Sequence, residues 1–159
     1  MKILRWITLV LFFSVFACAN DLDVKILKNI YENVILKESS NALNSINTLE
    51  KSVNTKDEKE IKESFKRLII SWKSVEALYI LGDLDEDFID TPRLMDIFHN
   101  GNEDIKKQLD FAFKSGEDAK VALFKNSLKS INALEYIIYT KDLKDEKVQK
   151  FLYTIINSS

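Results

Sequence analysis

The sequence contains few residues that interrupt helices. It has one proline and three glycines in 159 residues, and these are the residues that most often break helices or allow tight turns. Strict alternation of apolar and polar residues is scarce, whereas apolar residues recur three and four positions apart. That spacing is the period of an amphipathic helix. The sequence therefore predicts an all-α protein and argues against a fold built from strands.

Cysteine and histidine each occur once. The single cysteine, Cys18, leaves the mature chain without a disulfide, so its stability must come from packing. A lone histidine, His99, cannot build a His-rich zinc site, and the zincin pattern His-Glu-x-x-His is absent. His99 follows Phe98 and precedes Asn100-Gly101 at a predicted helix end, where the helix dipole favours a histidine.

The chain also has no excess of basic residues. Without Lys2 and Arg5 it carries 21 basic and 25 acidic residues, and the basic ones form no stripe. Because binding to phosphate backbones needs clustered Lys and Arg, this composition argues against nucleic acid as a partner.

The first nineteen residues have the order of a bacterial signal sequence. Lys2 and Arg5 precede an apolar run over residues 6–16, which is shorter than the roughly 20 residues that span a bilayer. Ala17-Cys18-Ala19 is a small-residue cleavage region. Cleavage after Ala19 would release a soluble periplasmic protein starting at Asn20. Residues 15–18 also resemble a lipobox, although Phe16 fits it poorly, and would leave a lipid on Cys18 as the only membrane attachment.

The remaining residues, 20–159, are expected to form one helical domain. Helices are predicted at about residues 21–53, 55–79, 91–100, 103–114, 117–139 and 145–156. The second of these begins with a capping box at residues 55–58. Ser39-Ser40-Asn41 is expected to kink or split the first helix, and Gly82 to end the second. Short connections between these helices predict an antiparallel, up-and-down bundle.

The segment at residues 117–139 contains the most informative pattern. Phe124, Leu128, Ile131, Glu135 and Ile138 follow a 4-3-4-3 spacing, which places them on one face of a continuous helix. Glu135 is therefore expected on the core seam, where a carboxylate is costly unless it is paired or bound. Two readings remain open: an ion pair with Arg93, Lys125 or Lys129, or a role in binding a ligand, with the neighbouring Ser130 and Asn132.

Several segments resemble the imelysin family of exported bacterial helical proteins. Residues 130–139, Ser-Ile-Asn-Ala-Leu-Glu-Tyr-Ile-Ile-Tyr, are similar to the helix that carries the family motif Gly-x-His-x-x-Glu. Trp72 with Tyr79, residues 89–93 and residues 95–98 resemble other family segments in the same order, so the resemblance covers about residues 30–141. It implies the first half of the family's longer two-bundle domain, from either a short relative or a truncated chain.

The motif is incomplete in this sequence. Ser130 stands at the motif glycine, Asn132 at the motif histidine, and only Glu135 matches. Because an amide oxygen is a weak transition-metal ligand compared with imidazole, a metal on Glu135 should bind weakly, if at all. The resemblance implies an envelope binding protein, with Ser130, Asn132 and Glu135 lining the remnant site, iron or another divalent metal as ligand and iron-transport components as partners.

Two other functions compete with this one. The first is a structural or interaction module that has lost the family site. The second is a metallopeptidase, as the family's name suggests, and the missing histidine argues against it.

Two further groups of residues have simpler interpretations. Asp83, Asp85 and Asp87 begin like a calcium loop, but Phe88 and Leu94 stand where that loop needs Gly and Glu. We therefore expect residues 83–91 to form a solvated acidic loop. The aromatic residues are expected in the core: Trp72, Tyr79, Phe111, Phe113 and Phe124.

Overall fold

The computed structural model describes residues 21–89 and 103–158. Within these residues the chain is helical and has no strand, which confirms the all-α prediction. The chain divides into two compact units, residues 1–39 and residues 40–159. The predicted signal sequence lies outside the described residues, as do the predicted helix at residues 91–100 and His99.

The first unit is helical over its described residues. Residues 21–30 are followed by the π-helical turn η1 (Tyr31–Ile35), and α2 (Leu36–Thr55) begins in this unit. Ion pairs one turn apart join Lys25 to Asp21 at 3.3 Å and Lys28 to Glu32 at 3.8 Å. The predicted split at Ser39-Ser40-Asn41 is wrong, because α2 continues through these residues, although the boundary between the units falls after Ser39.

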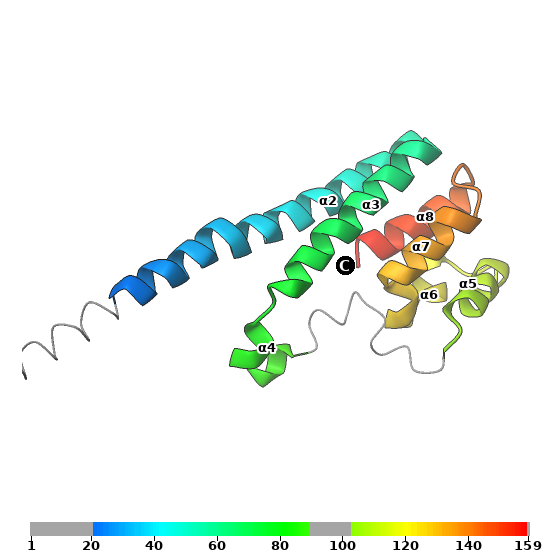
Figure 1. Cartoon of the computed structure of the whole chain (residues 1–159). Coiled ribbons are helices and arrows are strands. Elements are labelled where there is room, and N and C mark those ends of the chain that lie inside the picture. The colour runs from blue at the N-terminus through cyan, green and yellow to red at the C-terminus, as the bar shows by residue number, and fades with distance from the viewer. Residues whose placement is uncertain (1–20, 90–102, 159) are drawn as a thin grey trace, which may run out of the picture. The chain divides into compact units, whose positions relative to one another are not determined.

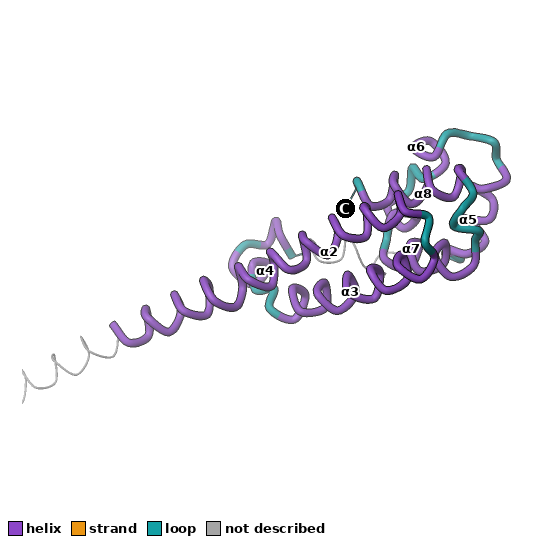
Figure 2. The backbone as a smooth tube through the Cα atoms, turned by 90° about the horizontal axis from the view of Figure 1, so that it is seen from above, coloured by secondary structure: helices purple, strands orange, loops and turns teal. Residues whose placement is uncertain are grey.

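The second unit contains the other helices of the described residues (Figure 1). They are α3 (Glu58–Ala77), α4 (Leu81–Leu84), the 3-10 turn η2 (Glu86–Phe88), α5 (Ile105–Lys114), α6 (Ala119–Ala122), the 3-10 turn η5 (Asn126–Lys129), α7 (Ile131–Thr140) and α8 (Glu146–Ile156). Within this unit α2 and α3 run side by side in opposite directions, and so do α7 and α8 (Figures 1 and 2).

Aspartate caps the N-termini of four helices in this unit. Asp57, Asp104, Asp118 and Asp145 each accept a hydrogen bond from a backbone N–H in the first turn of α3, α5, α6 and α8. A short acceptor satisfies amides that have no partner inside the helix. The predicted cap of α3 at Thr55 is therefore wrong by two residues. Asp57 takes that role, while the Thr55 hydroxyl donates to Glu60 Oε2 at 3.0 Å.

The glycines mark a helix end at one position and a close approach at another. Gly116 has a φ of 76° just after α5, which is the left-handed conformation that commonly follows a helix. Gly82 does not end α3 as predicted, because α3 ends at Ala77 and Gly82 lies in α4. A Cβ on Gly82 would lie 2.7 Å from the Cα of Ile89, so the backbone approach needs a residue without a side chain.

The core of the second unit surrounds α7. This helix contacts α3, α5, η5 and α8, and its buried face consists of Ala133, Leu134, Ile137 and Ile138. The other helices contribute Leu49, Val53, Ile61, Phe65, Leu68, Leu109, Val148, Phe151, Leu152 and Ile155. Phe151 stacks on Phe113 with a centroid distance of 4.3 Å. The described residues therefore form a packed helical bundle.

The continuous helix predicted at residues 117–139 is wrong. The segment instead forms α6, η5 and α7, with irregular backbone between them. Leu123 leaves the helical region, and Lys125 and Ser130 are extended, with ψ of 140° and 167°. None of these positions is Gly or Pro, so the breaks have no composition signal. They change which residues of the segment share a face.

Candidate functional site

Ser130 is the buried N-cap of α7. Its side chain is 1% exposed, its Oγ accepts a hydrogen bond from Ala133 N at 3.3 Å, and its hydroxyl donates to Ser127 O at 2.8 Å. Both hydrogen-bonding functions of the hydroxyl are therefore used by the protein's own backbone. The buried Ser130 hydroxyl therefore caps the N-terminus of α7, the helix at the centre of the core.

Glu135 lies on the outside of α7. Its side chain is exposed, and Asn132 is half-buried. The predicted core seam is therefore wrong at this position, because α7 begins at Ile131 and buries Ala133, Leu134, Ile137 and Ile138 instead. No ion pair joins Glu135 to another described residue, and Lys125 pairs with Glu103 at 2.8 Å. Arg93, the third predicted partner, lies outside the described residues.

The acidic segment after α3 is short and largely exposed. Asp83, Asp85 and Asp87 are all exposed, and part of the segment is helical, in α4 and η2, rather than an open loop. Asp85 caps η2 by accepting from Asp87 N at 3.1 Å. Within residues 21–89 and 103–158, no group of three or more His, Cys, Asp or Glu side chains is arranged to hold a metal ion.

The predicted aromatic core is only partly correct. Phe113 stacks on Phe151, and Trp72 and Tyr79 are half-buried. Phe111 and Phe124 are exposed, at 74% and 71%. Phe124 lies in the irregular backbone after α6, where helical periodicity no longer determines which way a side chain faces. The Trp72 indole N–H is buried and has no hydrogen-bond partner among the described residues.

A polar cluster joins α5 to α7 and the turn after it. Asp110 accepts hydrogen bonds from the Lys141 ammonium and, at 3.0 Å, from the Tyr136 hydroxyl. The Lys141 hydrogen bond, followed by that of Tyr136, lowers the pKa of Asp110. The Lys141 ammonium also lies 5.0 Å from the centre of the Tyr136 ring, within the range of a cation–π contact. All three side chains are thus satisfied by one another, and the cluster acts as a cross-link between helices.

A second cluster fixes the irregular segment after α6. Glu103 accepts from Lys125 Nζ at 2.8 Å and from the Ser127 hydroxyl at 3.0 Å. The Lys125 hydrogen bond is the main cause that lowers the pKa of Glu103, and the Ser127 bond adds to it. These contacts hold η5 against the start of α5.

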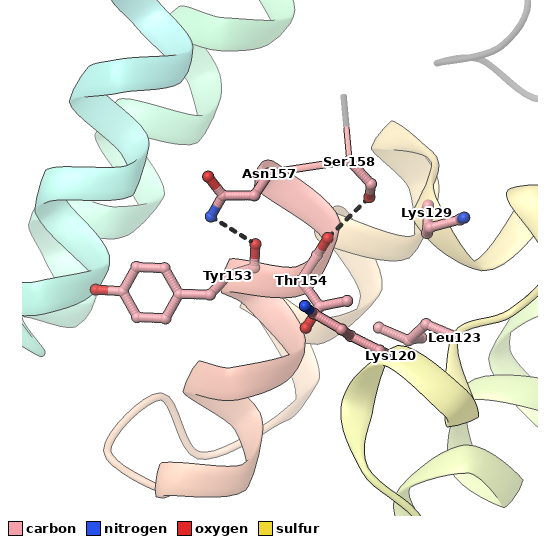
Figure 3. A pocket seen from close by; sticks show the side chains of 7 residues that line it. All are labelled: Lys120, Leu123, Lys129, Tyr153, Thr154, Asn157 and Ser158. Carbon is pink, nitrogen blue, oxygen red and sulfur yellow. Dashed lines mark hydrogen bonds between the residues drawn. The ribbon is translucent and has the colours of Figure 1, made fainter.

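A pocket of about 510 Å3 lies between α6, η5 and the C-terminal end of α8 (Figure 3). Lys120 comes from α6 and Lys129 from η5. The lining is completed by Leu123, Tyr153, Thr154, Asn157 and Ser158. None of the described residues that line this pocket has a carboxylate side chain, and none forms an ion pair with Lys120 or Lys129. Sequence reasoning named Lys129 only as a possible partner of Glu135 and did not single out Lys120, because no motif connects the two lysines.

The polar side chains of α8 in this pocket face two ways. Tyr153 and Asn157 point toward α2 (Figure 3), where the Tyr153 hydroxyl bonds to Asn54 and the Asn157 amide to Glu50 at 3.4 Å. Thr154 and Ser158 remain on the side of the two lysines. Their hydroxyls donate to backbone carbonyls, Thr154 to Lys150 O at 2.9 Å and Ser158 to Thr154 O at 2.8 Å.

The described helices give no candidate for a membrane span, because none is both long and apolar enough. No protein family model, no curated protein and no solved structure matches this chain.

Proposed function

We propose that this chain is an exported, imelysin-like binding protein of the bacterial envelope. Export is supported by the order of basic, apolar and small residues over positions 1–19. The family assignment is supported by the segments that follow one another in the family's order between about residues 30 and 141. More specifically, we propose that the bundle corresponds to the N-terminal half of an imelysin-type domain.

The observation that carries the binding role is the pocket beside α8. Its volume of about 510 Å3 lies in the range of small-molecule sites, roughly 300–1,000 Å3. Two lysines without ion-pair partners among the described residues line it. A protein that binds a small ligand needs such a concave site, with a few polar groups that fix the ligand's orientation.

Service in iron acquisition, with iron-transport components as partners, is the narrower form of this proposal and rests on the resemblance. A divalent metal would use the carboxylate of Glu135 and the amide oxygen of Asn132, which lie three residues apart on α7. Ser130 contributes little to such a site because its hydroxyl already serves the backbone. One carboxylate and one amide are a weak donor set, so such a metal would bind weakly.

Export is tested by the mature N-terminus. The protein is expressed in a Gram-negative host, cells are fractionated, and the chain from each fraction is analysed by intact-mass spectrometry. We expect periplasmic protein that begins at Asn20, or membrane-associated protein with a lipid on Cys18. A Cys18→Ser variant separates the two, since it abolishes the lipid but leaves cleavage after Ala19. Intact chain beginning at Met1 in every fraction would refute export.

A second candidate is a structural or interaction module that keeps the bundle without the family site. The observation in its favour is that Ser130 serves as a helix cap while Glu135 is solvent-exposed and unpaired among the described residues. Titration with zinc and ferrous iron, and with the anionic probes described below, separates the candidates. A ligand detected by either titration favours the binding protein, and cleavage of a peptide substrate would instead favour the metallopeptidase.

A further inference from the structure

We propose that the pocket between α6, η5 and α8 binds a small anion that carries hydroxyl groups, such as a sugar phosphate or a sugar acid. This inference names a ligand class for the proposed binding protein, and so it rests on that proposal. It does not depend on iron, on export or on residues 130–135.

The first support is the charge of the pocket. Lys120 and Lys129 contribute two basic side chains to one pocket, and none of the described residues that line it is acidic. Some other lysines among the described residues pair with a carboxylate, for example Lys125 with Glu103 and Lys141 with Asp110. An anion in the pocket would supply the charge that the described side chains do not, through charge-assisted hydrogen bonds from the ammonium groups.

The second support is the wall formed by α8. Because the Thr154 and Ser158 hydroxyls donate their hydrogens to backbone carbonyls, their oxygens present lone pairs and act as acceptors. This wall therefore suits groups that donate, such as ligand hydroxyls, and repels a bare anion. The two lysines come from α6 and η5, and in Figure 3 their ammonium groups point in opposite directions, that of Lys120 toward α8 and that of Lys129 away from it.

Together the two walls define the ligand's chemistry. The anionic group should lie at one of the two lysines, and hydroxyl groups should face Thr154 and Ser158. A cavity of about 510 Å3 accommodates a ligand with the size of a hexose derivative, because small-molecule sites begin at roughly 300 Å3. The competing explanation is that the lysines only complement the negative end of the α8 dipole.

The test is isothermal titration calorimetry of the full-length protein with four probes: glucose 6-phosphate, gluconate, glucose and inorganic phosphate. We expect glucose 6-phosphate, gluconate or both to bind, which also tells a phosphate ligand from a carboxylate ligand. Glucose should bind at least about tenfold more weakly, because a hydrogen bond to a charged group contributes roughly 1.5–3 kcal/mol, and 1.4 kcal/mol corresponds to a tenfold change.

Variants locate the site and separate its two walls. Of the variants Lys120→Gln and Lys129→Gln, the one that removes the ammonium group in contact with the anion should weaken the bound probe about tenfold, by the same argument. Lys144→Gln, which changes an exposed lysine outside the pocket, should leave binding unchanged. Thr154→Val removes one acceptor, and should weaken glucose 6-phosphate or gluconate without strengthening inorganic phosphate. Circular dichroism verifies that each variant is folded.

Three results would overturn the inference. The first is that neither glucose 6-phosphate nor gluconate produces heat of binding at about 10 mM, well above a weak Kd of about 1 mM. The second is binding that survives both lysine variants. The third is inorganic phosphate that binds as tightly as either sugar derivative. For an exported protein, any of these results would refute this ligand class and remove the observation that carries the binding role, but it would leave export standing. Binding by a protein that stays in the cytoplasm would refute export alone.

Discussion

Replacing Ser130 by alanine tests whether the motif position serves the helix or a ligand. The hydroxyl lies in the core at 1% exposure, caps α7 and donates to Ser127 O. Ser130→Ala removes both hydrogen bonds and adds no bulk. Because α7 contacts α3, α5 and α8, any fraying of its first turn weakens the centre of the bundle.

The expected cost follows from the two lost contacts. Loss of a Ser cap costs about 1 kcal/mol, within a range of roughly 0.5–2. The unpaired Ser127 carbonyl adds up to about 1 kcal/mol, so the free energy of unfolding should fall by about 1–2 kcal/mol. The second unit spans residues 40–159, and at roughly 2.1 cal/mol/K per residue its unfolding entropy converts 1 kcal/mol into about 4 °C. The expected decrease in Tm is therefore about 4–8 °C.

Urea unfolding followed by circular dichroism measures this loss, with two companion variants. Ser130→Gly should cost less than Ser130→Ala, because glycine is itself tolerated at an N-cap. Thr140→Ala removes an exposed hydroxyl of the same helix, which donates to Tyr136 O at 2.6 Å. It should change stability by less than about 0.5 kcal/mol, since such surface changes are usually small.

The reasoning would be refuted if Ser130→Ala were as stable as the wild type. It would also be refuted if alanine and glycine were equally destabilising, because the loss would then not come from capping. If Ser130→Ala abolished binding of zinc or ferrous iron without any loss of stability, the motif position would serve a ligand.

Three further outcomes follow from the structure. Gly82→Ala should lower the Tm, because its Cβ would meet the Ile89 backbone at 2.7 Å, and differential scanning calorimetry with no decrease would show that α4 and η2 adjust freely. Asp110→Asn should flatten the acid limb of the stability–pH curve. The pKa of Asp110 is lowered from its usual 3.8, mainly by the Lys141 hydrogen bond. The charged Asp110 therefore stabilises the fold above about pH 4, and this stabilisation is lost as the pH falls through the lowered pKa. An unchanged acid limb would contradict this reasoning. Asn132→His should tighten zinc or ferrous iron binding measured by calorimetry, since imidazole is a stronger donor than an amide. Glu135→Ala should remove that gain, and a gain that survives it would place the metal elsewhere.

The parts of the fold that sequence predicted well are those where periodicity and caps agree. Residues 103–114 and 145–156 were predicted as helices and correspond to α5 and α8, each starting after an aspartate cap. The end at Ser115-Gly116 was also predicted, because a glycine after an apolar helical stretch is a strong stop signal.

The candidate site was predicted less well because one assumption determined it. The pattern from Phe124 to Ile138 presupposes a continuous helix, and the chain turns at residues 123–125 and at Ser130 instead. After such a break, the later residues no longer share the helix face that the spacing predicts. Glu135 therefore lies on the surface and not in the predicted core. The only local signal was Ser130 itself, since a serine three residues before a buried stretch is a typical N-cap.

The pocket could not have been found from sequence. Lys120, Lys129 and Thr154 lie on three elements, and their common position depends on how α6 and η5 pack against α8. Spacing along the chain does not contain that information.

The attachment of α8 to α2 bears on when this chain can fold. Gln149 donates to Val53 O, and Asn157 to Glu50, across 96 and 107 residues. The same helix buries Val148, Phe151, Leu152, Ile155 and Ile156. Because α8 packs on α2 across 96 to 107 residues, the core of the second unit cannot close before α8 has been synthesised, and contacts of such long sequence separation form late in folding.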